Sequence, residues 1–295
     1  MLRQGAGARA VPLACVGLAV LCFQLGAALA KPLFARVGPE GASALRLGLA
    51  ACALNAALRP WRAPVPRGML GWTVGYGLGL AGLNLFFYFA IERLPLGVTV
   101  AVEFLGPLSL AVAASRRRID FLWAALAGGG MLCLVPGAQA AGARDLAGFG
   151  FALLSAGSWV LYIICGQRAG QLGSRAVALG VAVAAAAVLP LGLAHAGRDL
   201  LRPDVLPLGI AVAAISACLP YGLEMVALSR LPTRVFGILM SLEPAAGALF
   251  GYLLLGQQLT GLQGLAIAAV MAASAGSSLS AASTDAPHPV PAAPA

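Results

Sequence analysis

Apolar segments close to the length of a membrane span recur along the whole chain, with little sequence between them. A helix needs about 20 mostly apolar residues to cross the hydrocarbon core of a bilayer. Backbone groups in that core must be paired within their own segment, which favours helices over strands. The fold class predicted is therefore an all-α integral membrane protein. We predict ten transmembrane helices, at residues 11–30, 40–58, 69–90, 95–114, 119–136, 146–166, 174–194, 206–228, 233–254 and 260–280.

The composition agrees with lipid as the main solvent. Charged residues make up 10% of the chain and hydrophobic residues 60%, against about 25% and 45–50% in soluble proteins. The net charge of +9 would suggest nucleic acid in a soluble protein. Here, apart from Arg46, the basic residues lie in the tails, at helix ends and between apolar runs, without the interleaved aromatic residues on which bases stack. We therefore predict no nucleic-acid partner.

The distribution of Lys and Arg predicts the orientation. Twelve of the 19 fall on the side of the N-terminus, six on the opposite side, and Arg46 within a helix. Because loops rich in Lys and Arg stay in the cytoplasm, we predict a multi-pass protein of the bacterial inner membrane with both termini cytoplasmic. The first apolar run, with Arg3 and Arg9 before it and Ala-Leu-Ala at 28–30, imitates a secretory signal. It is longer than a usual signal core, so we predict a retained helix.

An internal repeat relates the two halves of the chain. Residues 90–113 and 227–250 are identical at eight of 24 positions at an offset of 137, including the Arg-Leu-Pro triplets at 93–95 and 230–232. We interpret the chain as a duplication of five helices. Since five is odd, the two copies enter the membrane in opposite directions, and such inverted repeats are the architecture of many secondary transporters. A duplicated bundle that does not transport is the alternative.

The predicted division of the chain follows from this repeat. It comprises a cytoplasmic N-terminal tail (1–10), a first five-helix repeat (11–137), a second five-helix repeat (146–280) and a disordered cytoplasmic tail rich in Ala and Pro (281–295).

Two glutamates lie at the depth of the bilayer centre. Glu103 and Glu243 fall eight and eleven residues after the prolines of the Arg-Leu-Pro triplets, or about 12 and 16 Å along a helix. Glu103 precedes Pro107 by four residues and Glu243 directly precedes Pro244. Proline kinks a helix and frees a carbonyl in the preceding turn, and an intramembrane acid is functional by default. The alternative is a neutral carboxyl that only holds two helices together.

Other polar side chains on apolar helices are candidates for the same site. Glu224 is a third acid at shallower depth. Arg46 has two interpretations: it neutralises an acid or binds a substrate carboxylate, or it snorkels to the membrane surface. The remaining candidates for the wall of the site are Asn84, Tyr88, Tyr221, Gln24 and Tyr162.

The sequence contains no convincing motif for nucleotide binding, catalysis or metal binding. A dinucleotide-type glycine pattern at 77–82 lies inside an apolar helix with no preceding strand. Gly71, Gly75 and Gly79 instead predict a small-residue face for close helix packing. There is no phosphate-binding loop, neither histidine has a suitable nucleophile or ligand partner, and the six cysteines lack metal-site spacing. We predict no catalysis, no cofactor and no metal.

Particular stretches resemble a known family. Those that resemble the EamA-type drug/metabolite transporters are Phe23–Lys31, Ala44–Gly48, Asn84–Tyr88 and Leu94–Gly97. Those that resemble its bacterial threonine/homoserine exporter branch are Val102–Leu108, Leu219–Glu224 and Leu239–Pro244. The resemblance implies ten helices, cytoplasmic termini and efflux of small amino acids driven by the proton gradient. One position departs from it: the wider family usually has Gly-Glu before the last helix, and here the chain reads Gly256-Gln257-Gln258.

The resulting hypothesis is a secondary exporter of small amino acids, such as threonine or homoserine, that works by proton-coupled alternating access. Glu103 and Glu243 would bind the substrate ammonium or the coupling proton. The alternatives are export of another small metabolite or drug, such as a purine or a quaternary amine, and a membrane enzyme. The predicted partners are the small-molecule substrate, protons and the lipid bilayer, and a homo-oligomer is left open.

Overall fold

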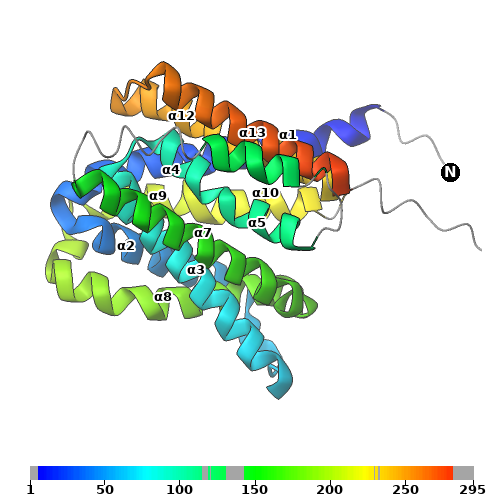
Figure 1. Cartoon of the computed structure of the whole chain (residues 1–295). Helices are drawn as coiled ribbons and strands as arrows, with labels where there is room; N and C mark the ends of the chain where they lie inside the picture. Colours follow the sequence, from blue (N-terminus) through cyan, green and yellow to red (C-terminus); the bar gives the residue numbers. More distant parts are fainter. Residues whose placement is uncertain are drawn as a thin grey trace, which may run out of the picture.

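The computed structural model describes residues 6–114, 119, 121–130, 143–228, 230–231 and 233–281, and it is a bundle of helices (Figure 1). Among these residues no strand occurs. Six helical stretches are long and apolar enough to span a membrane: Val11–Leu58, Arg67–Arg93, Leu146–Leu172, Ser174–Leu201, Leu206–Glu224 and Ile238–Leu255. Shorter apolar helices lie at Leu96–Leu110, Phe121–Gly130 and Gly261–Ser277. The chain is a multi-pass membrane protein.

The described helices overlap the predicted ranges, and their ends differ from the predicted ones by up to six residues. In the first half they are α1 (Ala6–Ala30), α2 (Phe34–Leu58), α3 (Arg67–Arg93), α4 (Leu96–Glu103) and α5 (Leu105–Ala114), with short 3-10 turns at Lys31–Leu33 and Pro60–Arg62. In the second half they are α7 (Ala143–Ala169), α8 (Ser174–Ala196), α9 (Leu206–Ala213), α10 (Leu219–Leu228), α11 (Thr233–Met240), α12 (Glu243–Leu255) and α13 (Gly261–Ala281). Further 3-10 turns lie at Gly170–Leu172 and Gly197–Leu201.

The predicted tails lie mostly outside the described residues. Residues 6–10, which the sequence predicts in the N-terminal tail, form the first turns of α1. Ala281, which it predicts in the C-terminal tail, is the last residue of α13. Of the helix predicted at 119–136, the structure describes residues 119 and 121–130, which are helical.

Two of the predicted helices are kinked near their middle, so that each consists of two labelled segments. Phe104 separates α4 from α5, three residues before Pro107, and residues 241–242 separate α11 from α12, two residues before Pro244. Proline has no N–H to donate and its ring clashes with the preceding turn, so each kink falls just before a proline. Phe104 and Leu242 keep right-handed helical dihedral angles, and Leu108 and Ala246 still donate to their carbonyls. Each irregularity is therefore a kink within a predicted helix, as the two prolines predict.

The predicted helix at 206–228 also differs from a regular α-helix. Residues Ala214–Cys218, between α9 and α10, form a turn of π-helix. A π-turn widens the helix and disturbs the regular pairing of carbonyls with amides four residues on, and such turns occur often at functional sites. Pro220 follows two residues after this turn and has no N–H to donate to the carbonyl of Ser216, four residues earlier, so the sequence does contain a signal for the irregularity.

Close packing of small residues brings the helices together. α3 packs along α7 and α8, α2 along α8, and α1 against α10 and α12. A Cβ on Gly79 would lie 2.6 Å from the backbone nitrogen of Tyr162, and one on Gly75 would lie 2.6 Å from the sulfur of Cys165. Both glycines therefore belong to the predicted packing face. Gly71 does not, because nothing lies within 4 Å of the corresponding point.

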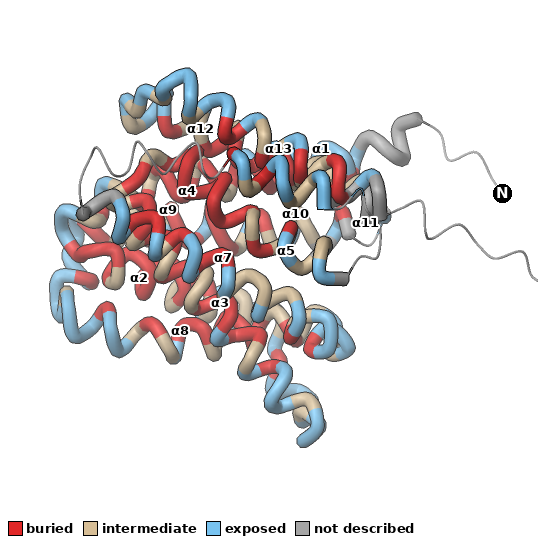
Figure 2. The backbone as a smooth tube through the Cα atoms, viewed as in Figure 1, coloured by how far each residue is buried: buried red, intermediate tan, exposed pale blue. Residues whose placement is uncertain are grey.

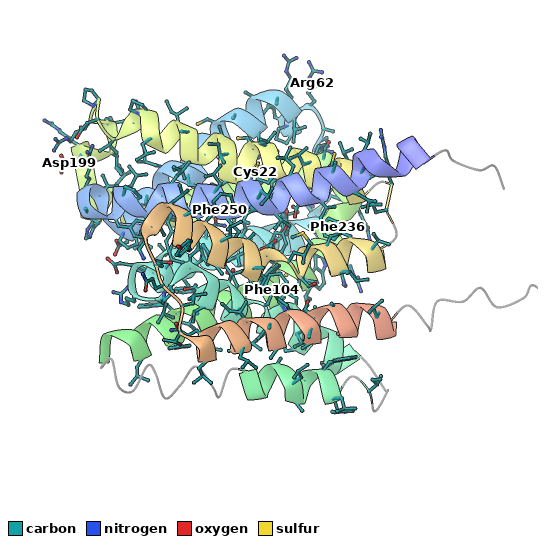
Figure 3. The ribbon with its side chains drawn as sticks, turned by 90° about the horizontal axis from the view of Figure 1, so that it is seen from above. Cys22, Arg62, Phe104, Asp199, Phe236 and Phe250 are labelled. Carbon is teal, nitrogen blue, oxygen red and sulfur yellow. The ribbon has the colours of Figure 1, made fainter. Side chains whose placement is uncertain are left out.

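Buried residues occupy the middle of the bundle and exposed ones its outside (Figure 2). Many exposed side chains are large and apolar, as a lipid-facing surface requires, for example Leu122, Leu191 and Leu265. Charged side chains mark the ends of helices: Arg36 and Asp204 form a salt bridge of 2.8 Å. Figure 3 shows Arg62 and Asp199 at the edges of the molecule, whereas Phe104 lies among the helices. The middle of the bundle also contains buried polar side chains, among them Arg46, Glu103 and Glu243.

The packing of α3 gives a paired test by single methyl addition. Gly79→Ala would push a methyl group into the backbone of α7, and overpacking of this kind costs about 1–3 kcal/mol. Gly71→Ala meets open space and replaces glycine by the better helix former. We expect the melting temperature of the detergent-solubilised protein to fall for Gly79→Ala and to stay level or rise for Gly71→Ala. Equal melting temperatures for the two variants would contradict the α3–α7 contact.

Candidate functional site

A cavity of about 130 Å³ lies where α1, α2, α3, α4, α7, α10, α11 and α12 meet. Its polar lining includes one guanidinium, from Arg46 of α2, and three carboxyls, from Glu103, Glu224 and Glu243. An engineered cavity of about 150 Å³ is large enough to bind benzene. The volume therefore suits one small molecule, and the lining offers that molecule groups of both charges.

Each of the two central carboxyls lies at the kink of a helix. Glu103 is the last residue of α4 and Glu243 the first of α12, and each side chain is 6% exposed. Ser155 of α7 donates a hydrogen bond to Glu103 Oε1. Gln24 of α1 donates from Nε2 to Glu243 Oε2 at 3.4 Å. Pro107 is the third residue of α5 and Pro244 the second of α12, so in each repeat the buried acid lies just before a proline.

Arg46 is held in the interior by α3 and the π-turn. Its Nη2 donates to the carbonyl oxygen of Ser216 at 2.8 Å, and its guanidinium lies 5.6 Å from the ring centroid of Tyr88. The side chain is only 7% exposed, so the interpretation that Arg46 snorkels to the membrane surface is wrong. Its Nε has no hydrogen-bond partner within the described part of the chain. A buried donor without a partner is costly, and this one belongs to a residue that lines the cavity.

The charged groups lie close enough to influence one another. Glu243 interacts electrostatically with Glu103 and Glu224, and Glu103 also with Arg46. The arrangement can hold a proton on one carboxyl and attract a cation to another, while the guanidinium side attracts an anion.

Most of the site residues predicted from sequence meet at this cavity. Tyr88 is the exception: it is fully buried and packs against Arg46 without lining the cavity. Pro244 is buried beside Glu243, and Pro107 lines the neighbouring wider cavity. The predicted residues that do line the small cavity are Gln24, Arg46, Asn84, Glu103, Tyr162, Tyr221, Glu224 and Glu243.

Other residues of the site were not predicted. Ser155 bonds to Glu103, and Trp159 lines the cavity one helical turn later on α7. Polar or aromatic residues four apart share a helix face, which is the signal that could have found them. Ser216 accepts from Arg46 through its backbone carbonyl, and the signal for that free carbonyl is Pro220, four residues later, which has no N–H to donate to it. The other lining residues outside the predicted set are Phe23, Ala27, Leu80, Leu83, Phe87 and Met240.

A second, wider cavity of about 650 Å³ adjoins the first. The two share Trp159, Tyr162, Tyr221, Glu224 and Met240. Beyond these residues the wider cavity runs along the end of α7 and the start of α8, from Gly166 to Val177. It therefore extends from the polar site toward the end of the bundle where α7 finishes.

Comparisons with known proteins complete the description of the site. The model of the EamA-like transporter family matches residues 146–279. The threonine/homoserine exporters RhtA of Salmonella typhimurium strain LT2 and Escherichia coli strain K12 are each 46% identical to this chain over 270 residues. The alignments cover 91% of this chain and 92% of each relative. A solved crystal structure that is 20% identical aligns over 92% of this chain and 98% of its own, with a TM-score of 0.60, and so shares the fold.

Proposed function

Because the chain belongs to the EamA-like transporter family, we propose that it exports the small amino acids threonine and homoserine across the bacterial inner membrane. Relatives that are 46% identical carry the name of threonine/homoserine exporters. The observation that carries the proposal is the small interior cavity lined by Arg46 and three carboxyls. A transporter family and transporter relatives also argue against the alternative of a membrane enzyme.

The charges of the cavity complement those of an amino-acid zwitterion. The guanidinium of Arg46, whose Nε has no acceptor among the residues that the structure describes, would bind the substrate carboxylate through a charge-assisted hydrogen bond. Glu103 or Glu243 would bind the ammonium group. Asn84, Gln24 and Tyr221 line the same space and would contact the rest of the substrate. A quaternary amine would suit the aromatic rings of the lining, but it has no carboxylate to bind the guanidinium of Arg46.

We further propose that ten spans form two inverted repeats around this site. Shifted by 137, the bounds of α4 become 233–240, which are those of α11, and the start of α5 falls one residue before the start of α12. The kink in each repeat therefore occurs at the equivalent place. The family match at residues 146–279 agrees with the proposed second repeat. Inverted repeats around a central site are suited to alternating access.

Coupling to protons follows from the same carboxyls. A carboxyl that is protonated in the empty site would release its proton as the substrate ammonium binds beside it, because coupled acids share charge and protons. Protons entering the cell would then drive the amino acid outward. With the orientation predicted from Lys and Arg, the wide cavity opens at the end of α7 toward the cytoplasm, from which an exported substrate enters.

The first experiment measures efflux of labelled threonine and homoserine from cells that contain the protein. We expect faster efflux than in cells without it, and loss of the difference when an uncoupler collapses the proton gradient. Glu103→Gln and Glu243→Gln should each reduce efflux at least tenfold, because an amide cannot exchange the proton or pair with the ammonium.

The matched control is Glu92→Gln, since Glu92 pairs with Arg93 at the end of α3 and does not line the cavity. It should export at the unmodified rate, with equal amounts of each variant in the membrane. Unmodified efflux by both Glu103→Gln and Glu243→Gln would overturn the role of the carboxyls.

A second test addresses carboxylate recognition by Arg46. We expect threonine to compete for export far better than threoninamide, which lacks the carboxylate, and Arg46→Met to reduce this preference about tenfold or more, as loss of a charged hydrogen bond would. Arg36→Met is the control, because Arg36 lies on the same helix but is exposed and pairs with Asp204. The ratio of the two competitors does not depend on protein amount. An unchanged ratio in Arg46→Met would show that Arg46 does not read the carboxylate.

A further inference from the structure

The two ends of the proposed transport path are built differently. At one end α4 packs directly on α12. A Cβ on Gly97 of α4 would lie 2.8 Å from the Cα and the backbone nitrogen of Ala248 in α12, and one on Gly247 would lie 3.2 Å from Val100. At the other end α5 and α11, the repeat equivalents of α12 and α4, border the wide cavity through Pro107 and Phe236. The contact between α4 and α12 is therefore the closed end.

The side chain of Gln257 links α4 to the connection that follows α12 at this closed end. Gln257 lies in the connection between α12 and α13, directly after Gly256, whose φ of +61° ends α12 in a left-handed turn. Its backbone N–H donates to the carbonyl oxygen of Gly251 at 3.0 Å, which fixes the connection to the last turn of α12. Its side-chain Oε1 accepts a hydrogen bond of 3.0 Å from the backbone N–H of Leu96.

The bond to Leu96 has a specific physical role. Leu96 is the first residue of α4, and the first N–H groups of a helix have no acceptor within the helix. The residue before the helix, Pro95, makes no side-chain cap. The side-chain oxygen of Gln257, which lies between α12 and α13, therefore caps the start of α4. Separation of α4 from α12 breaks this bond.

We propose that Gln257 is a positioning residue for transport, which holds α4 against α12 and keeps this end of the path closed while the other end is open. The proposal rests on the proposed alternating access. With the predicted orientation the closed end faces the outside of the cell. Release of the substrate then requires Gln257 to leave Leu96, so the strength of one hydrogen bond sets part of the balance between the two states.

The experiment measures how often the closed end opens. Val100 is fully buried on α4 and lies against Gly247, so Val100→Cys places a thiol just inside the closure. Intact cells are treated from outside with a membrane-impermeant thiol reagent, and labelling of this thiol is followed by mass spectrometry with the native cysteines retained. Total thiol labelling after denaturation corrects for the amount of protein.

We expect Gln257→Leu, which removes the acceptor, to speed labelling about threefold to tenfold, the change in population that one hydrogen bond supports. Gln257→Glu keeps an oxygen acceptor, now charged, at the positive end of a helix, and should label no faster than the unmodified residue. Gln258→Leu is the matched control because Gln258 is the next residue and is exposed. It should leave the labelling rate unchanged.

The outcomes separate this proposal from the proposed function. Equal labelling rates for Gln257→Leu and Gln258→Leu, or equal acceleration by Gln257→Leu and Gln257→Glu, would overturn the role of Gln257 even if threonine export is found. Faster labelling in Gln257→Leu alone would support it even if the exported substrate proves to be another metabolite, because the labelling requires no substrate.

Discussion

The burial of charge in an apolar helix bundle is the constraint on which the structure depends. A guanidinium or carboxylate without partners costs several kcal/mol at this depth, and each central group here has a partner from a different helix. Arg46 bonds to the carbonyl of Ser216, Glu103 accepts from Ser155, and Glu243 accepts from Gln24. These partners come from residues far apart in the chain, so the long-range packing of the bundle and the polar site require each other.

Backbone irregularity supplies part of what these charges need. The prolines at 107 and 244 kink two helices next to the acids, and the π-turn presents the carbonyl that Arg46 binds. Irregular backbone at membrane depth is tolerated where it is buried in protein or lines a cavity. The same kinks therefore shape the cavity and position its charges, and their equivalence in the two halves supports the proposed inverted repeat.

Features that depend on the type of a residue at one position could be predicted from the sequence. Apolar runs located the helices, and an acid beside a proline at mid-membrane depth located Glu103 and Glu243. Features that depend on which neighbour a side chain or backbone atom contacts could not be predicted. Tyr88 looked like a wall residue but packs behind Arg46. Gly71 shares the spacing of Gly75 and Gly79 but faces open space. Spacing along a helix predicts which residues share a face, not which neighbour that face meets.

The central claim is that one interior site exchanges a small amino acid for protons. The most direct test uses the purified protein in liposomes that are loaded with threonine and a pH-sensitive dye, with no threonine outside. We expect outflow of threonine to acidify the lumen, because threonine leaves in exchange for protons. We expect Glu103→Gln to abolish this acidification. Threonine outflow without acidification, or no outflow from liposomes that contain the folded protein, would contradict it.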